Sequence, residues 1–331
     1  MVRKLPIGIQ GFEGLRKDGY LYVDKTEYIS RLAHEGKTYF LSRPRRFGKS
    51  LLLSTMKAYW EGKKELFEGL AIEKLEADNP DAWKKYPVFY FDLNGTNYQE
   101  KSALEDILDE HLRRCEQDRD ISTKKGAGLG ERFRDLLIAA SQEAGLRSVV
   151  LVDEYDKPLV DVMDRPELQD HNKAVFKGFF STLKSYDEYI QFVFITGVSK
   201  FHKVSIFSDL NQLRDISMSS EYACLCGITE EETGWYFNPE VNAFAQQRSM
   251  TEQECRNALK KQYDGYHFHP DGEGVYNPYS LLNAFVEKDF GSYWFETGTP
   301  TFLVNKLKET EFDLSKFTDH TLYASESLLK D

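Results

Sequence analysis

A short basic segment, residues 43–50, contains the residue types that bind phosphate. It reads Arg-Pro-Arg-Arg-Phe-Gly-Lys-Ser and follows an apolar run. Because Gly48 lets the backbone approach a ligand closely, and a helix start offers free N–H groups, such a loop can surround phosphate oxygens. Lys49 can bridge the β- and γ-phosphates, and the Ser50 hydroxyl can bind magnesium. The alternative is a basic, solvated turn, since the usual GxxxxGK[ST] pattern has glycine at the position of Arg43. The predicted phosphate-binding residues are Arg43, Pro44, Arg45, Arg46, Phe47, Gly48, Lys49, Ser50 and Leu51.

Two acidic residues, Asp153 and Glu154, follow the apolar run 148–152. In open α/β sheets, ligands bind beyond the carboxyl ends of the strands, where these residues would lie. We expect Asp153 to hold magnesium, directly or through water, opposite Ser50. Glu154 would orient and deprotonate the attacking water. The alternative is a strand end with solvated acids; it is weakened because the acids follow the phosphate loop by about 100 residues on an apolar strand.

A third apolar run, residues 191–196, ends in polar residues that can sense the nucleotide. In ATPases with a separate catalytic glutamate, a polar sensor on a neighbouring strand contacts the γ-phosphate or the water, and Thr196 or Ser199 would fill this role. The alternative for each is a plain strand followed by a turn. For Asp156 two interpretations are open: a surface pair with Lys157, or a contact with an arginine of the phosphate loop.

Four apolar runs are expected to form a parallel sheet. They are Tyr39–Ser42, Val88–Leu93, Val149–Asp153 and Phe192–Thr196. Continuous apolar character is typical of strands that are buried on both faces. Helical patterns lie between them, at Lys49–Trp60, Lys101–Asp118, Gly130–Ala144 and Asn172–Ser185. This alternation predicts the three-layer α/β fold of P-loop NTPases. We expect the run 192–196 to lie between the strand of the phosphate loop and the strand that ends at Asp153.

After about residue 200 the pattern changes to helix signals. Thr229 and Thr251 each precede a glutamate by three residues, which is a capping pattern. Asn277 followed by proline opens another helix, and residues 302–307 are a short helical candidate. The predicted domains are residues 1–200, a P-loop ATPase core, and residues 201–331, a mostly helical region that acts as a lid or couples to an effector.

The bulk composition is that of an acidic globular protein. Its 331 residues carry 43 Lys and Arg against 54 Asp and Glu, for a formal charge of −11. Such a charge gives no bulk attraction to nucleic acid or anionic membranes, so direct nucleic-acid binding stays open only for a local basic patch. The first residues form no apolar run of the kind that a signal peptide needs, so we expect none; nowhere do 18 apolar residues run together, and the four cysteines are irregularly spaced. We therefore expect a cytoplasmic protein with reduced thiols and no membrane span.

Together, these segments resemble the predicted AAA-ATPase-like family of bacteria. The resemblance rests on Tyr22-Val-Asp-Lys-Thr26, the loop 43–50, Asp153-Glu-Tyr-Asp156, Thr196-Gly-Val-Ser-Lys-Phe201, Tyr263-Asp-Gly-Tyr266, Tyr276-Asn-Pro-Tyr279 and Tyr293-Trp-Phe-Glu-Thr-Gly-Thr-Pro300. It covers nearly the whole chain. The arginine-rich loop is its most specific element, and in that family, as here, arginine stands where the usual pattern has the first glycine.

The resemblance implies an ATPase that uses ATP and Mg²⁺ and releases ADP. By its similarity to archaeal and signalling ATPases, the segment 22–26, with Tyr22 and Asp24, would lie beside the adenine; Asp24 or Thr26 could equally be a plain helix cap. Many members of the family continue into a PD-(D/E)XK nuclease-like domain, of which this sequence shows no sign. We expect the ATPase part of a longer protein, or a relative without that effector, with no nuclease activity of its own.

Three classes of function are open. The first is an active ATPase whose nucleotide cycle moves the helical region, and the second is a nucleotide-regulated binding module with little turnover. The third is the regulatory part of a nuclease system. Glu154 favours the first, because a protein that only holds nucleotide has no need of a base there. A homo-oligomer, a protein partner, and an arginine finger from Arg43, Arg45 or Arg46, within the chain or across an interface, are also open.

Two further clusters point to packing rather than to ligands. His267 and His269 have alternating spacing but no obvious third metal ligand. The four tyrosines of the motifs between residues 263 and 279 predict packing between the two regions in preference to stacking on nucleic-acid bases.

Overall fold

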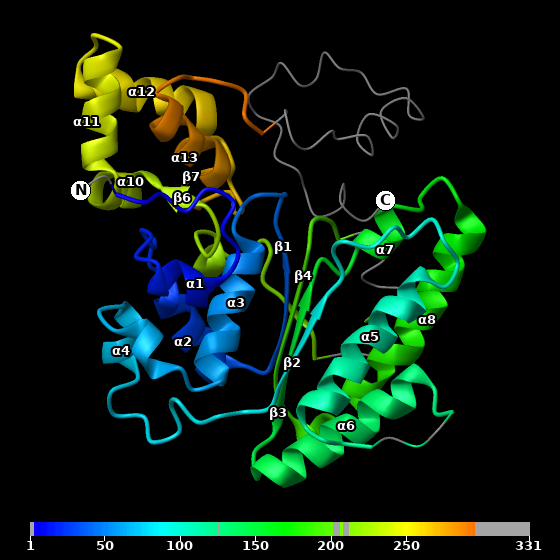
Figure 1. Ribbon diagram of the computed structural model, residues 1–331. Helices are drawn as coiled ribbons and strands as arrows, with labels where there is room; N and C mark the ends of the chain where they lie inside the picture. The colour runs from blue at the N-terminus through cyan, green and yellow to red at the C-terminus, as the bar shows by residue number, and fades with distance from the viewer. Residues whose placement is uncertain (1–2, 123, 125, 201–205, 208–211, 295–331) are drawn as a thin grey trace.

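The computed structural model describes residues 3–122, 124, 126–200, 206–207 and 212–294. A parallel five-stranded sheet forms its centre, with helices on both faces (Figure 1). The strand order is β2 (Val88–Asp92), β3 (Ser148–Asp153), β4 (Ile190–Gly197), β1 (Thr38–Ser42) and β5 (Arg214–Asp215). The position of β4 between β1 and β3 confirms the order predicted from the sequence. The edge strand β5 was not predicted.

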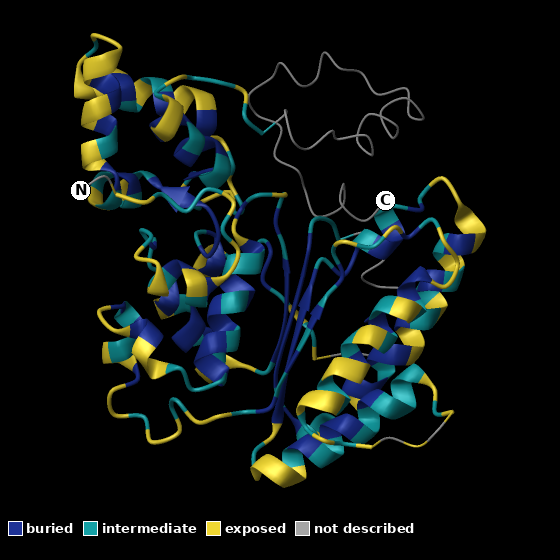
Figure 2. Cartoon of the chain, in the orientation of Figure 1, coloured by how far each residue is buried: buried dark blue, intermediate teal, exposed yellow. Residues whose placement is uncertain are grey.

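The long strands are apolar because helices cover both faces of the sheet. All six residues of β3 are buried, and the strands are the most uniformly buried elements in Figure 2. One face is covered by α3 (Lys49–Trp60), and the other by α5 (Ala103–Asp118), α6 (Leu129–Ala144) and α8 (Pro166–Ser185). This arrangement is the three-layer fold of P-loop NTPases, as predicted. Helix α8 begins at Pro166 instead of Asn172, because proline is well suited to a first helical turn.

A cluster of phenylalanine rings holds the helices of the second face to the sheet. Phe133 of α6 and Phe179 of α8 stack with their centroids 4.8 Å apart. Phe91 of β2 meets both rings edge-on, at 5.2 and 5.3 Å. Such ring pairs bury a large apolar area in specific geometries. They fix this helix layer against β2, beside the strand that ends at Asp153.

The second region is mostly helical and includes a two-stranded hairpin. Its elements are β6 (Ile228–Thr229), α10 (Glu230–Tyr236), α11 (Asn238–Gln247), α12 (Glu252–Tyr263), β7 (Val275–Tyr276) and α13 (Pro278–Glu287). Thr229 and Thr251 form the predicted capping boxes, each with the glutamate three residues later. The Asn277 side chain accepts a hydrogen bond from the Ser280 N–H at the start of α13. The helical candidate at 302–307 lies outside the described residues.

The N-terminal segment lies between the sheet and the second region (Figure 1). Its helices α1 (Phe12–Lys17) and α2 (Thr26–Glu35) lie on the same side of the sheet as α3, and α4 (Ala71–Leu75) packs on α2. By contrast, four apolar residues of this segment pack on the core of the second region: Leu5, Ile7, Leu21 and Val23. The remaining short elements are α7 (Lys157–Val160) and the 3₁₀ turns Lys64–Phe67, Asp187–Tyr189 and Ser220–Tyr222. Within the described ranges, no helix combines the length and the apolar character needed to cross a membrane.

Candidate nucleotide-binding site

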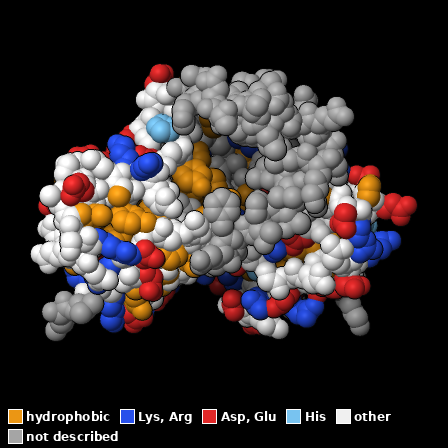
Figure 3. Space-filling view, turned by 90° about the horizontal axis from the view of Figure 1, so that it is seen from above, with side chains coloured by type: hydrophobic (Ala, Val, Ile, Leu, Met, Phe, Trp, Pro, Cys, Tyr) orange, Lys and Arg blue, Asp and Glu red, His pale blue; other side chains and the backbone are white. Residues whose placement is uncertain are grey.

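A cavity of about 690 Å³ opens where the phosphate loop, the N-terminal segment and the second region meet. Loop residues 45–50 and the first residues of α3 line it on one side. Asn94, Glu154 and Lys157 line it beyond the carboxyl ends of β2 and β3. Apolar side chains line the rest, among them Ile9, Leu21, Val23, Ile228, Phe237 and Leu282. Figure 3 looks onto this end of the molecule and shows hydrophobic side chains gathered near its centre.

Two residues in the left-handed backbone conformation shape the phosphate loop. Gly48 has a φ of 90° and directly precedes α3, and Arg46 has a φ of 68°. A side chain at Gly48 would meet no other atom within 4 Å, so the need for glycine there is conformational. No side chain caps the start of α3. The N–H groups of its first turn therefore lack a side-chain acceptor at the edge of the cavity.

Lys49 lines the cavity, but its ammonium group is bound by the loop itself. Its side chain is buried, and Nζ donates to the carbonyl oxygens of Arg43, at 3.0 Å, and Pro44, at 3.2 Å. Binding a phosphate would require Nζ to exchange these acceptors for phosphate oxygens. Ser50 and Leu51 also line the cavity, whereas Pro44 contributes only its carbonyl oxygen to Lys49.

The structure corrects the prediction for Arg43. Its side chain is fully buried beneath the loop and does not line the cavity. The guanidinium group donates to the carbonyl oxygens of Ser42, Ser217 and Tyr222 at 2.9, 2.7 and 3.0 Å, and lies 3.8 Å from the ring centroid of Phe268. Burial lowers the pKa of Arg43 to about 10, which leaves it charged at neutral pH. Arg43 therefore joins the loop to the segment that follows β5 and cannot contact a phosphate in this position.

The next three side chains of the loop diverge. Arg46 stacks on the ring of Tyr279 at 3.8 Å, and Phe47 is buried against Tyr266 and Phe268, with centroid distances of 4.7 and 5.6 Å. These contacts confirm the predicted packing between the two regions for two of the four tyrosines. Arg45 is exposed and lines the cavity.

Asp153 lies behind the cavity, bound by two hydroxyl groups. Thr196 donates to its Oδ1 at 2.7 Å, and Tyr90 donates to its Oδ2 at 3.4 Å. Both Asp153 and Thr196 are buried, and neither lines the cavity. The two residues predicted on neighbouring strands are thus brought together, but Thr196 contacts the carboxylate instead of facing the cavity.

Glu154, the next residue, turns toward the cavity. Its backbone φ is 52°, so the chain bends directly after β3 and Glu154 leaves the line of the strand. Burial raises the pKa of Glu154 above its ordinary value, against the positive charge of Lys49. The negative charges of Asp153 and Asp156 add to the rise. A carboxyl group with a raised pKa in a cavity is a candidate for proton transfer.

Asp156 follows neither of the interpretations left open for it. Its buried carboxylate accepts from the backbone N–H groups of Val198 and Ser199, and from the Ser199 hydroxyl at 2.7 Å. It therefore ties the end of β4 to the turn after β3. Lys157 pairs with Asp161 instead. Ser199, predicted as a sensor, is committed to Asp156 and does not line the cavity.

The segment predicted to lie beside the adenine divides between two roles. Tyr22 lines the cavity, and its hydroxyl lies 3.4 Å from that of Thr55. Asp24 does not line the cavity. Its carboxylate accepts from the N–H and hydroxyl of Thr26 and from the N–H of Ala71. Asp24 is not the N-cap of α2, which is Lys25 and has no side-chain cap; its carboxylate instead joins the first residue of α2 to the first residue of α4.

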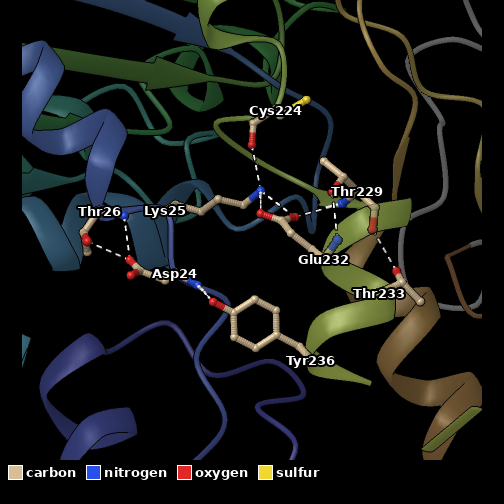
Figure 4. Close-up of polar contacts among 8 residues, drawn as sticks. All are labelled: Asp24, Lys25, Thr26, Cys224, Thr229, Glu232, Thr233 and Tyr236. Atoms are coloured by element: carbon tan, nitrogen blue, oxygen red, sulfur yellow. Dashed lines mark hydrogen bonds and ion pairs between the residues drawn. The ribbon is translucent and has the colours of Figure 1, made fainter. Parts of the chain in front are cut away.

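Lys25 connects the same segment to the second region (Figure 4). Its Nζ donates to Glu232 at 2.7 Å and to the carbonyl oxygen of Cys224 at 2.8 Å. Glu232 is also the glutamate of the capping box that opens α10. The Asp24 N–H donates to the Tyr236 hydroxyl one turn further along α10. The start of α10 is thus fixed against the N-terminal segment.

His267 and His269 lie in the segment between α12 and β7. His269 accepts from the Asp271 N–H through Nδ1. Within the described ranges, no group of three His, Cys, Asp or Glu side chains is arranged to hold a metal ion. The other two motif tyrosines, Tyr263 and Tyr276, pack within the core of the second region.

Several lining residues were missed by reasoning from the sequence. Asn94 and Lys157 follow strands that were predicted, so their position beyond the strand ends was the available signal. The apolar residues of the N-terminal segment and the second region gave no such signal, because a side chain that lines a cavity resembles one that fills a core.

Comparison with known proteins agrees with this architecture. Residues 6–207 match the family described as Predicted AAA-ATPase. Over 308 residues, the chain is 42% identical to an uncharacterized protein in the vnfD 5′ region of Azotobacter chroococcum mcd 1. That alignment covers 93% of this chain and 56% of the relative, so the chain spans little more than half of the relative's length. The chain belongs to the predicted AAA-ATPase family.

Proposed function

We propose that this chain binds ATP with magnesium and hydrolyses it to ADP and phosphate. The observation that carries the proposal is the shared cavity, in which the phosphate loop and Lys49 meet a carboxyl group, Glu154, with a raised pKa. A phosphate-binding loop alone would support binding only. A proton acceptor in the same cavity supports hydrolysis as well.

The phosphate end of the cavity has the donors that a triphosphate needs. Lys49 would move from the carbonyl oxygens of Arg43 and Pro44 to the β- and γ-phosphate oxygens. This exchange replaces two neutral acceptors with charged ones, which form stronger hydrogen bonds with an ammonium group. The uncapped first turn of α3 would donate backbone N–H groups to the phosphates.

The oxygen atoms near this end fit magnesium. Ser50 offers a hydroxyl group at the cavity and Asp153 a carboxylate behind it, and magnesium prefers such hard oxygen donors. Ser50 would bind the ion directly and Asp153 through water. Bound there, the ion would offset the negative charge of the phosphates. Thr196 would position Asp153 through their 2.7 Å hydrogen bond.

Glu154 would accept the proton of the attacking water. Burial raises its pKa toward neutrality, where proton transfer by a general base is most efficient. It must be ionised to act, and the positive charge of Lys49 favours that form.

The apolar end of the cavity would hold the base. Ile9, Leu21 and Val23 come from the N-terminal segment, and Ile228 and Phe237 from the second region. These side chains offer apolar surface on which a flat ring can be buried. The base would therefore contact both parts of the molecule at once.

A second candidate is a nucleotide-regulated binding module with little turnover. Arg46 and Phe47 favour it, because these loop residues contact the second region. Nucleotide at the loop could thereby change a surface that a partner recognises, without hydrolysis.

The experiment is calorimetry with ATP, combined with phosphate release by the purified chain. Lys49→Ala should lose tight ATP binding, because the loop loses its mobile charge. Glu154→Gln should retain ATP binding and lose turnover by about 10²–10⁴-fold, the range for a missing general base.

Arg114→Ala is the matched control, since Arg114 lies on α5 and pairs with Glu110 in the same helix. Equal ATP affinity in wild type and Lys49→Ala would refute the assignment of this loop as the phosphate-binding site. Full turnover in Glu154→Gln would show that Glu154 is not the general base. Binding of ATP without turnover in the wild type would favour the nucleotide-regulated binding module.

A further inference from the structure

We propose that Arg45 is the arginine that contacts the γ-phosphate during hydrolysis, and that it does so in the active site of its own chain. The inference rests on the proposed ATPase function and adds a residue to it. It assigns separate tasks to the three arginines of the phosphate loop, which the sequence alone could not distinguish.

Two of the three arginines are committed elsewhere. Arg43 is fully buried, and its guanidinium group donates to three backbone carbonyl oxygens. Arg46 lies 3.8 Å from the ring centroid of Tyr279, on the second region. Moving either one to a phosphate would break contacts that hold the loop to the rest of the molecule.

Arg45 is exposed and lines the cavity together with Lys49 and Glu154. Across the described parts of the chain, its guanidinium group has no hydrogen-bond or ion-pair partner. Its backbone is held, because the Trp294 indole N–H donates to the Arg45 carbonyl oxygen at 3.4 Å. The backbone is thus anchored while the charged end is available to a ligand.

The charges around Arg45 fit a role at the terminal phosphate. Arg45 and Glu154 line the same cavity, so a ligand bound there would lie close to both side chains. Glu154 is the residue proposed to face the attacking water, and the γ-phosphorus must lie next to that water. A planar guanidinium group can donate two parallel hydrogen bonds to phosphate oxygens, which the single ammonium of Lys49 cannot do.

The step conserves atoms and charge without a further reactant. The oxygen of water forms a bond to the γ-phosphorus, and the bond from that phosphorus to the β-γ bridging oxygen breaks. Glu154 takes the proton from water, and ADP leaves with the electron pair of the broken bond. Arg45 forms no covalent bond; it donates hydrogen bonds to the γ-oxygens as their charge redistributes.

The test is single-turnover hydrolysis of ATP by Arg45→Ala and Arg45→Lys, with ATP and ADP affinities from calorimetry. Arg45→Ala should slow the step by about 10³-fold, as loss of such an arginine does elsewhere. Its ADP affinity should stay within about threefold of the wild type, because ADP lacks the γ-phosphate. The rate of hydrolysis by Arg45→Lys should lie between those of the wild type and Arg45→Ala. Added guanidinium ion should partly restore the rate of Arg45→Ala.

Mixing identifies the source of the arginine. If Arg45 acts in its own chain, an equimolar mixture of Arg45→Ala and Glu154→Gln should stay inactive. Recovery on mixing would place the arginine in a neighbouring copy and overturn the inference. The exposed Arg114→Ala, with its side chain on α5, controls for the loss of one positive charge.

Other results separate this inference from the proposed function. Hydrolysis by Arg45→Ala within threefold of the wild type would overturn the role of Arg45 and leave the ATPase intact. If the wild type binds ATP without turnover, Arg45→Ala should still lower the affinity for ATP relative to ADP by tenfold or more; an unchanged ratio would refute the contact. If the wild type binds neither nucleotide, both proposals fail.

Discussion

Glu154 combines two features that set it apart from an ordinary surface glutamate. Its backbone φ of 52° bends the chain out of line with β3, and partial burial removes water from its carboxyl group. The second effect raises its pKa above the ordinary value for glutamate, and the neighbouring carboxylates of Asp153 and Asp156 add to it. Residues held in sparsely populated backbone regions cluster at functional sites, which is consistent with the role proposed for Glu154.

We predict that the acidic limb of the kcat profile lies at higher pH than an ordinary glutamate would give. A general base acts when ionised, so the rate should rise with pH through the raised pKa of Glu154. The measurement is phosphate release at saturating ATP between pH 4.5 and 9, in buffers of matched ionic strength. A limb centred at or below the ordinary pKa of glutamate would contradict the prediction.

The carboxyl group of Glu154 also makes the stability of the folded protein depend on pH. Because its pKa is raised by folding, the folded protein binds this proton more tightly than the unfolded chain does. The protein therefore loses stability as the pH rises from the unfolded pKa through the folded one. Glu154→Gln should remove this loss. At pH values above the folded pKa the variant should unfold at a higher urea concentration than the wild type, and below the unfolded pKa the two should not differ.

Arg43 marks the limit of what the sequence could reveal at the residue scale. Its type and position next to the loop predicted a phosphate contact, and the strand, loop and helix around it were all predicted correctly. Its acceptors, however, are carbonyl groups of Ser217 and Tyr222, and its ring contact is Phe268. The direction of a side chain in a loop depends on such distant partners, which local sequence does not specify.

At the scale of elements, the pair Lys25–Glu232 fixes α10 against the N-terminal segment. The exposed fractions of the two side chains are 10% and 16%, so the pair is largely shielded from water. Lys25 also donates to the Cys224 carbonyl oxygen, and Glu232 also accepts from the Thr229 N–H. Removing one charge would leave the other without its partner in a poorly hydrated place.

We predict that Lys25→Met and Glu232→Gln each lower the free energy of unfolding by about 2–4 kcal/mol. The double variant should lose clearly less than the sum of the two, since the second change removes a charge that is already unpaired. Glutamine in place of Glu232 keeps the acceptor of the capping box, so the cycle isolates the charge. Urea unfolding without nucleotide measures each term.

The control cycle uses Arg114→Met and Glu110→Gln, an exposed pair within α5. Its coupling should be about 0.5 kcal/mol or less. Additive losses for Lys25 and Glu232 would show that the contact does not hold α10.

The sequence predicted the elements with strong periodic signals and missed those without. The four long strands were found because continuous apolar runs need two covered faces. The edge strand β5 consists of Arg214 and Asp215 and has no apolar residue to reveal it. Capping boxes located α10 and α12, whereas α11, which lacks a side-chain cap, was not found.

At the scale of the whole molecule, the phosphate loop contacts both regions at once. Phe47 is buried between Tyr266 and Phe268, and Arg46 stacks on Tyr279 at the start of α13. A ligand that shifts this loop therefore acts directly on the second region. Sequence motifs identified the tyrosines as packing residues, but their partners in the loop became visible only in three dimensions.

We predict that nucleotide binding slows hydrogen exchange in α13, and that this protection needs the ring of Tyr279. Tyr279→Ala removes the surface on which Arg46 stacks, so the protection should fall to less than half, while Tyr279→Phe keeps a ring and should retain it. The measurement is hydrogen–deuterium exchange of peptides from residues 278–287, with and without ATP. Equal protection in the wild type and Tyr279→Ala would show that the two regions are coupled by other contacts.

The position of β1 in the sheet also sets a sequence of events during synthesis. The phosphate loop follows β1, whose two neighbours, β4 and β5, both come later in the chain. The ribosome must add about 150 residues after Ser42 before β4 emerges, which at typical rates of synthesis takes roughly 7–30 s. During that interval β2 and β3 can already pair, but β1, which precedes the phosphate loop, has no neighbouring strand. The proposed nucleotide site would therefore be complete only after β4 has been synthesised.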